Sequence, residues 1–235
     1  MSARCARFNR IPGGSRLEVL IADESRSMKF GLIADIHEHV DQLQKCLQVL
    51  RAEGVDQIVM VGDVVEMGQR MHQTCEMLAA ARTVGVWGNH DFGLCVDPSE
   101  ELRQRYGDVV IDYMTSLKPR MVIEHCYFAH IEPWLNPELL DDLWSFDGMP
   151  ESAERRELIF SAQPQRIMFA GHYHRWMLVS PERTEDWDGR KPIRLHVGRF
   201  FVVLDALAQG CFAVYDTDSG WLTPYRSAEV KSNSS

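Results

Sequence analysis

The chain has 235 residues, of which 45% are hydrophobic and 25% are charged. These proportions are close to the averages for soluble globular proteins, and they exclude a disordered, collagen-like or low-complexity chain. Its 34 acidic residues outnumber 25 basic ones, and the net charge of −9 argues against broad binding to nucleic acid or to an anionic membrane. The sequence contains no apolar run long enough to span a bilayer.

The six cysteines are scattered along the chain and form no C-x-x-C pair. This spacing indicates neither a zinc ribbon nor a disulfide framework. Free thiols in a reducing compartment are the simplest interpretation, so we expect a cytoplasmic protein.

The first 27 residues mix Arg with Gly, Pro and Ser, and we expect residues 1–27 to form a poorly ordered extension. Because Met28 directly precedes the first strong apolar run, we hypothesise that it is the natural start of the protein. Residues 28–226 are expected to form a single domain, since no stretch within them is long enough to be a linker. A polar tail at 227–235 follows.

From residue 30 onward, short β-rich runs alternate with segments of helical periodicity, a pattern typical of βα units in an α/β protein. The capping signal Asp97-Pro98-Ser99-Glu100, with Asp97 as the N-cap and Pro98 at the first helical position, predicts a helix that continues to about Tyr106. A weaker helical pattern covers 110–117. The other elements expected in this half are strands at 30–34, 57–61 and 83–87 and helices at 39–53 and 69–82.

The second half of the chain is predicted to contain strands at 121–128 and 166–169. Two helices between them are expected to begin near residues 136 and 151. The last third has three further β-rich runs, which we expect to be consecutive antiparallel strands joined by short turns. These runs lie at 193–197, 200–205 and 211–216.

Polar side chains gather at the ends of five of the expected strands. Ligands of open α/β sheets bind beyond the carboxyl ends of the strands, so these clusters can converge on one point. Carboxylate, imidazole and amide donors together suit divalent transition metals. A single histidine after a strand is more often an ordinary loop residue, but five such clusters in order favour a metal site. The seven donors are too many for one ion and about right for two; they are Asp35, His37, Asp63, Asn89, His130, His172 and His174.

The same residues form ordered motifs, and through them the sequence resembles the calcineurin-like metallophosphoesterases, in particular the small bacterial phosphodiesterases. The motifs are D-x-H at 35–37, G-D-x-x-x-x-G at 62–68, G-N-H-D at 88–91, the lone His130, and G-H-x-H at 171–174. The resemblance covers about residues 29–216. It implies an α/β fold in which two mixed β-sheets pack as a sandwich flanked by helices, with the site at one edge.

The resemblance also implies two divalent metal ions. Asp, His and Asn ligands suit Mn, Fe, Zn and Ni alike. Carried over position by position, it assigns one ion to Asp35, His37, Asp63 and His174. It assigns the second ion to Asp63, Asn89, His130 and His172. Asp63 would then bridge the two ions, and a metal-bridging hydroxide would attack the phosphorus of the substrate.

His90 lies between the ligand Asn89 and Asp91 without being a ligand itself, and it is the expected proton donor to the leaving oxygen. Glu66 stands where an acid orients this histidine in the protein-phosphatase branch of the family, so we expect a contact between Glu66 and His90. Together with the ligands Asp63 and Asn89, these two residues form the expected catalytic set.

Two departures from the family pattern bear on the substrate. Met67 stands where the protein phosphatases carry an Arg, and G-N-H-D replaces their G-N-H-E. We therefore expect a phosphodiester or a small nucleotide-like phosphate rather than a phosphoprotein. Arg199 could contact a phosphate and Trp134 could stack on a base, but a solvated Arg and a Trp at the core edge are the favoured interpretations.

The alternative to an enzyme is a non-catalytic, metal-binding scaffold module of the same fold. Every ligand position of the family pattern is filled in this sequence, and this favours the enzyme.

Overall fold

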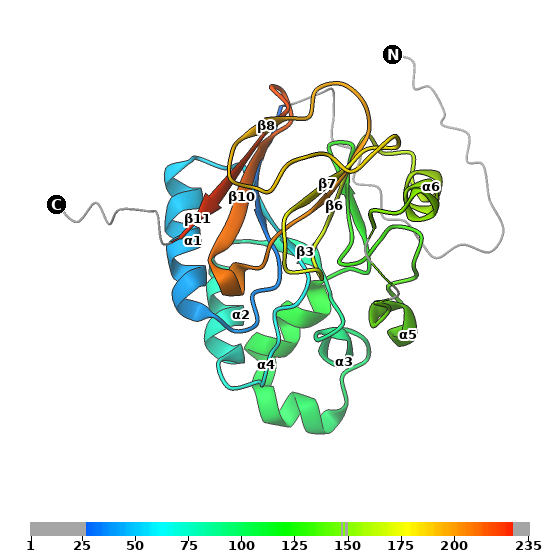
Figure 1. Ribbon diagram of the computed structural model, residues 1–235. Coiled ribbons are helices and arrows are strands. Elements are labelled where there is room, and N and C mark those ends of the chain that lie inside the picture. Colours follow the sequence, from blue (N-terminus) through cyan, green and yellow to red (C-terminus); the bar gives the residue numbers. More distant parts are fainter. Residues whose placement is uncertain (1–26, 147, 149, 228–235) are drawn as a thin grey trace, which may run out of the picture.

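The computed structural model of the protein describes residues 27–146, 148 and 150–227. Nearly all of the expected N-terminal extension and C-terminal tail lie outside the described residues. Within them, two mixed β-sheets pack face to face, and helices cover the outer side of each sheet (Figure 1). This is the sandwich that the resemblance implies. Among the described helices, none is both long and apolar enough to cross a bilayer.

The first sheet has six strands in the order β3-β2-β1-β10-β11-β8. Strands β1, β2 and β3 are parallel neighbours, whereas β10, β11 and β8 add to β1 in antiparallel fashion. Their bounds are β1 Lys29–Ile33, β2 Gln57–Val61, β3 Val84–Val86, β8 Ile193–Arg194, β10 Cys211–Asp216 and β11 Trp221–Arg226.

The second sheet has five strands in the order β4-β5-β6-β9-β7. Its centre is parallel, because β5 pairs with β6 and β6 pairs with β9 in the same direction, while β4 and β7 run antiparallel at the two edges. The bounds are β4 Met121–Ile123, β5 Cys126–Phe128, β6 Ile167–Ala170, β7 Met177–Val179 and β9 Phe200–Val203.

Aromatic side chains fill the space between the two sheets. Phe30 of β1 meets Phe128 of β5 edge to face, with ring centroids 5.8 Å apart. Phe128 in turn stacks on Phe169 at 5.4 Å, and Phe169 contacts Tyr215 of β10 at 5.4 Å. Each of these rings is almost fully buried. Large buried rings dominate core energetics, so this row fixes the two sheets against each other.

Helices form the outer layers of the fold. On the six-stranded sheet lie α1 (Val40–Ala52), α2 (Met71–Ala80), α3 (Phe92–Cys95) and α4 (Glu100–Ser116), and their apolar residues share one buried cluster with the outer face of β1 and β2. On the five-stranded sheet lies α6 (Ala153–Ala162). The single turn α5 (Leu140–Leu143) lies near α3 (Figure 1), and its Leu143 is buried in the cluster under the six-stranded sheet. A 3-10 turn, η1 (Leu207–Gln209), precedes β10.

The helical patterns locate the helices well, with small differences at their ends. The two helices expected before and after residue 107 are both present, and the label α4 covers them together; they meet at a kink at Gly107, whose φ of 73° and ψ of 172° are not helical. The cap of this helix is Ser99, whose hydroxyl accepts the N–H of Leu102, and not Asp97. The strand expected at 121–128 is a hairpin of β4 and β5, because Glu124 and His125 both adopt positive φ angles.

The expectation of three consecutive antiparallel strands in the last third is wrong. Strand β9 belongs to the five-stranded sheet, where it is parallel to β6, whereas β8 and β10 belong to the other sheet. Strand β11, which lies between β8 and β10, and strand β7 were not expected. Periodicity reports only that a run is buried and extended. It carries no information about which sheet a buried run such as β9 joins.

Candidate metal centre

The polar clusters follow β1, β2, β3, β5 and β6 directly and meet at one edge of the sandwich. The backbone there is unusual, because five of the seven predicted donors adopt left-handed φ angles between 45° and 72°. Such a conformation costs on the order of 1–3 kcal/mol per residue, and it is found mainly at functional sites. These residues are Asp35, His37, Asp63, His172 and His174.

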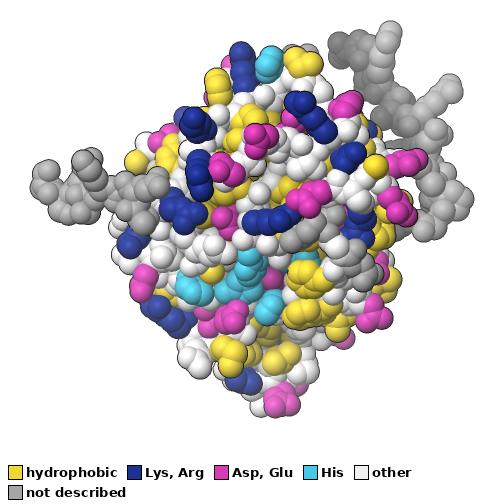
Figure 2. Space-filling view, viewed as in Figure 1, with side chains coloured by type: hydrophobic (Ala, Val, Ile, Leu, Met, Phe, Trp, Pro, Cys, Tyr) yellow, Lys and Arg dark blue, Asp and Glu magenta, His cyan; other side chains and the backbone are white. Residues whose placement is uncertain are grey.

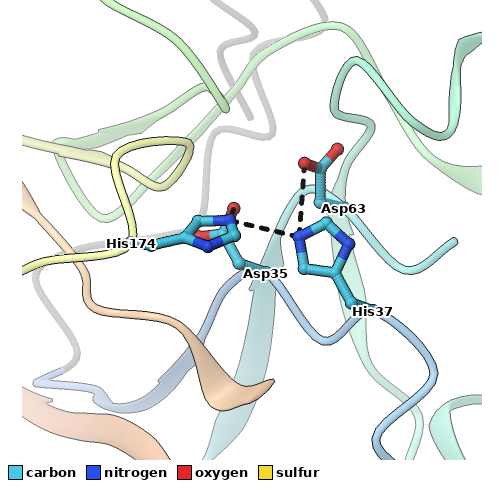
Figure 3. A group of neighbouring side chains, drawn as sticks. All are labelled: Asp35, His37, Asp63 and His174. Atoms are coloured by element: carbon cyan, nitrogen blue, oxygen red, sulfur yellow. Dashed lines mark hydrogen bonds and ion pairs between the residues drawn. The ribbon is translucent and has the colours of Figure 1, made fainter. Parts of the chain in front are cut away.

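A first group of donor side chains comprises Asp35, His37, Asp63 and His174, whose ligand atoms all lie within 4.8 Å of one another. Figure 3 shows the four side chains pointing toward one another; Asp35 and His37 come from the loop after β1, Asp63 from the loop after β2 and His174 from the loop after β6. Nε2 of His174 lies 3.2 Å from Oδ1 of Asp35. Nε2 of His37 lies 3.1 Å from Nε2 of His174 and 3.7 Å from Oδ2 of Asp63.

A second group joins Asp63 to Asn89, His130 and His172. Oδ1 of Asn89 lies 3.1 Å from Nε2 of His130 and 3.0 Å from Nδ1 of His172. Nε2 of His130 also lies 3.3 Å from Oδ2 of Asp63. The same carboxylate oxygen of Asp63 therefore faces a histidine of each group, and all seven predicted donors lie in one continuous cluster.

Backbone carbonyls fix the orientation of two of these rings. Nδ1 of His130 lies 2.8 Å from the carbonyl oxygen of Val61, and Nδ1 of His37 lies 3.1 Å from that of Val65. A carbonyl only accepts hydrogen bonds, so Nδ1 carries the proton in each ring. The lone pair of Nε2 then points into the cluster, which is the arrangement of a metal-binding histidine.

Facing acceptors make a cation the natural occupant of this cluster. Nε2 of His37 faces Nε2 of His174 at 3.1 Å, and Nε2 of His130 faces an amide oxygen at the same distance. Lone pairs this close repel each other unless a proton or a metal ion lies between them. Two almost fully buried carboxylates, those of Asp35 and Asp63, add negative charge that a buried site must compensate. The donor set thus fits divalent cations.

The pKa values of several histidines and carboxylates at the site are shifted by burial and by the charges of their neighbours. Complete burial lowers the pKa of His130, but the carboxylates of Asp63 and Asp35 outweigh it and raise that pKa to about 10. Burial raises the pKa of Asp63, yet its histidine neighbours hold it well below the usual range. His172, by contrast, has its pKa lowered to about 3 by burial and by the charge of His130. The two carboxylates therefore favour positive charge beside them, at His130, and not at His172.

The glycines of the motifs leave room for this cluster. A Cβ at Gly62 would lie 2.2 Å from Nδ1 of His130, and one at Gly88 would lie 2.1 Å from Oδ1 of Asp63. A Cβ at Gly171 would lie 2.7 Å from a carboxylate oxygen of Asp35. Any side chain at these positions would displace a predicted ligand.

Asp91 links the loops that follow β2 and β3 through hydrogen bonds, a role that was not predicted from the sequence. The buried carboxylate accepts backbone N–H groups from Asp63 at 2.8 Å, Val64 at 2.9 Å, Val65 at 3.0 Å and Gly88 at 3.0 Å. Burial, together with the charge of Asp63, raises the pKa of Asp91 to about 6. The only signal for it in the sequence is its place as the last residue of the G-N-H-D motif.

Glu38 anchors the loop after β2 in a similar way. Its buried carboxylate accepts the backbone N–H groups of Glu66 at 3.0 Å, of Gly68 and of Arg70 at 2.7 Å. The loop at 65–70 is thereby fixed next to the first donor group.

The half-exposed His90 lies beside the donors, and its backbone N–H bonds Oδ1 of Asp63 at 3.1 Å. Its ring meets that of His37 edge to face at 4.9 Å. Glu66 lies within 4.8 Å of both histidines, but its short contact, 2.8 Å, is with Nδ1 of His37. The contact expected between Glu66 and His90 is therefore replaced by one with His37, whose protonated nitrogen faces the loop.

Trp134 and Arg199 make contacts that stabilise the fold. The indole N–H of Trp134 donates to Glu132 at 2.7 Å, and the guanidinium of Arg155 covers the ring, so this side chain lies at the core edge as favoured. Arg199 is not a solvated side chain, because its guanidinium donates to the backbone carbonyls of Phe160, at 2.8 Å, and of Gln163.

The chain belongs to the calcineurin-like phosphoesterase superfamily, whose domain matches residues 28–220. Its fold is similar to a metallophosphoesterase from Sphaerobacter thermophilus, with a TM-score of 0.69 and 21% identity over 86% of this chain and 88% of that one. It is also similar to a putative diadenosine tetraphosphatase, with a TM-score of 0.54 and 19% identity over 85% and 93% of the two chains. At these identities the likeness shows the fold.

A sequence relative is an uncharacterised protein of Methanocaldococcus jannaschii, 24% identical over 141 residues. The match covers 50% of this chain and 58% of the relative, so the chain spans little more than half the length of that protein.

Proposed function

We propose that the protein is a dinuclear-metal phosphoesterase that hydrolyses phosphodiesters or small nucleotide-like phosphates. The observation that carries the proposal is the pair of donor groups that share the carboxylate of Asp63, with ring nitrogens and amide oxygen turned toward one another at about 3 Å. Donors in this arrangement need cations between them. Membership of a phosphoesterase superfamily supports a role for those cations in phosphoester hydrolysis.

The first ion would be held by Asp35, His37, Asp63 and His174, and the second by Asp63, Asn89, His130 and His172. When bound, two divalent cations activate water and neutralise phosphate oxygens near neutral pH. The contribution of the chain is to hold these donors in place before substrate arrives. The backbone anchors formed by Asp91 and Glu38 serve that purpose, because they fix the loops that carry Asp63 and Asn89.

His90 supplies the proton for the leaving oxygen. Its ring lies beside the donor cluster, in contact with His37 and half-exposed to solvent, so it can reach a substrate without being a ligand. In its imidazolium form it would stabilise the negative charge that develops on the leaving oxygen and then protonate it.

Support for a small, non-protein substrate comes from two sides. Met67, exposed beside Glu66 in the loop after β2, replaces the arginine of the protein phosphatases. Structural neighbours include a putative diadenosine tetraphosphatase and a protein described as a novel archaeal phosphodiesterase, which has a TM-score of 0.50 and 11% identity over 85% and 99% of the two chains.

The test is hydrolysis of bis-p-nitrophenyl phosphate and of p-nitrophenyl phosphate by metal-free protein reconstituted with Mn, Ni, Zn or Fe. Turnover should depend on metal and be lost in Asp63→Asn. Asp218→Asn is the matched control, because Asp218 is exposed in the turn between β10 and β11, near the start of β1 and so at the opposite end of the sheet from Asp35.

The ratio of diester to monoester turnover would show whether phosphodiesters or phosphomonoesters are the preferred substrates. Turnover that survives complete metal removal would contradict the proposal. Stoichiometric metal binding with no turnover of either ester would instead favour a metal-binding scaffold module of the same fold.

A further inference from the structure

Two aromatic side chains, Trp144 and Phe146, lie against histidines of the candidate metal centre. The ring of Trp144 lies 5.2 Å from that of His90, tilted by 44°. The ring of Phe146 stacks on that of His172 at 4.1 Å, with the two planes 22° apart. We call these two residues the aromatic platform.

The platform is exposed on its outer side. Trp144 keeps 48% and Phe146 keeps 57% of its surface accessible to water. Leu139 and Leu140, from the same segment, are also exposed. Figure 2 shows hydrophobic side chains next to the group of histidines on this face of the molecule. Exposed apolar surface beside a polar site is typical of a ligand-binding surface.

The segment that carries the platform is held in place. Leu143, the last residue of α5, is fully buried in the core under the six-stranded sheet. The backbone N–H of Trp144 bonds the carbonyl of Leu140 at 3.1 Å, and a carboxylate oxygen of Asp142 accepts the N–H of Asn136 at 2.8 Å. Trp144 therefore presents its ring in a defined position, and binding there would lose little conformational entropy.

We propose that the platform binds a flat aromatic group of the substrate, a nucleobase or an aryl group joined close to the scissile phosphate. Phe146 stacks one face on His172 while Trp144 lies tilted against His90, and both rings keep about half of their surface exposed for stacking, an interaction that all nucleobases can make. The contact of Trp144 with His90, the proton donor in the proposed mechanism, places the aromatic group on the side of the leaving oxygen. This inference rests on the proposed function and adds a substrate preference to it.

The experiment compares ligands that share a phosphate and differ in the aromatic group. AMP and ribose 5-phosphate form one pair, and phenyl phosphate and methyl phosphate form the other. Their dissociation constants are measured by calorimetry on the full-length, manganese-loaded protein. We expect each aromatic ligand to bind about tenfold or more tightly than its partner, and the pair with the larger ratio identifies the natural group.

In Trp144→Ala this ratio should fall about tenfold, while the affinity for ribose 5-phosphate stays unchanged. Trp144→Phe should restore most of the ratio, which a change in folding would not do. Trp221→Ala is the matched control, since Trp221 is exposed to a similar degree, 44%, on strand β11. Metal content, measured on each variant, separates a lost platform from a disturbed centre.

An unchanged ratio in Trp144→Ala, or the same affinity for both members of each pair in the wild type, would overturn the platform. These results are independent of the hydrolysis test. If the ratio of affinities depends on Trp144 but the protein shows no turnover, the platform is supported and the proposed enzyme is contradicted. If the protein shows turnover but the ratio is unchanged in Trp144→Ala, the enzyme is supported and the platform is contradicted.

Discussion

Glu66 contacts His37 at the ring nitrogen that faces away from the candidate metal centre. Its Oε2 lies 2.8 Å from Nδ1, while Nε2 of the same ring lies 3.1 Å from Nε2 of His174. A carboxylate on the outer nitrogen of a histidine keeps the proton there and increases the basicity of the inner nitrogen. Glu66 is therefore a positioning residue for a proposed metal ligand.

Glu66→Gln should weaken binding at the first metal position. Outer partners of this kind are worth about 10- to 100-fold in metal affinity, and the exposure of Glu66 places the effect at the lower end. Competition with a chelator measures the affinity. If metal affinity is unchanged while kcat falls, Glu66 acts on His90 instead.

His90→Ala should lower kcat by about 10²- to 10⁴-fold, the usual contribution of a general acid, with metal content near that of the wild type. The hydrogen bond to Asp63 is made by the backbone N–H of His90, so it persists in the variant. Turnover and elemental analysis on the same preparation test this. Loss of both metals would assign His90 to the metal centre rather than to proton transfer.

Asp91→Asn should destabilise the fold. Each carboxylate oxygen accepts two backbone N–H groups, and the amide NH2 of Asn can accept neither of the two that it would face. Leaving two buried donors unsatisfied costs about 2–5 kcal/mol in the free energy of unfolding. Urea denaturation gives this value, with Asp218→Asn as the exposed control. A loss below about 0.5 kcal/mol, as for ordinary surface changes, would contradict the anchoring role.

The described cysteines should resist alkylation in the folded protein. All five are free and buried, and burial raises the pKa of Cys75, Cys126 and Cys211 to about 12. At pH 8 only about one such thiol in 10⁴ is then ionised. In a Cys5→Ser background, iodoacetamide should add no label at pH 8 before unfolding and five after it. Rapid labelling of the native protein would refute their burial.

The same shifts give the sign of a pH effect on stability. Unfolded thiols ionise near pH 8.5, below the folded pKa of about 12. Their contribution to stability is fully present below about pH 8.5, and it declines as the pH rises toward 12. The free energy of unfolding should therefore be lower at pH 10 than at pH 7, and replacing Cys126 by Ala should reduce that difference.

The sequence predicts the convergence of the site well, because the carboxyl ends of parallel strands share one sheet edge. Asp35, Asp63 and Asn89 follow three parallel neighbours, and His130 and His172 follow two more in the facing sheet. Their proximity needs only the strand order within each sheet.

Other features depend on contacts that local patterns do not encode. The sheet to which β9 belongs is decided by pairing with β6, more than 30 residues earlier in the chain. Asp91 looks like any loop carboxylate until the four N–H groups around it are in place. The partner of Glu66 differs from the expected one because two histidines, His37 and His90, lie within reach of the same oxygen.

The residues with left-handed φ angles at the strand ends place the proposed metal ligands, but their strained backbone lowers the stability of the fold. Glycine would adopt the φ of 49° at His174 without strain, and His174 is partly exposed, so its side chain adds little to the core. His174→Gly should therefore fold at least as stably as the wild type while it binds metal poorly. Selection for folding stability alone would replace such residues by glycine. Histidine is kept at position 174 by selection for the placement of a metal ligand.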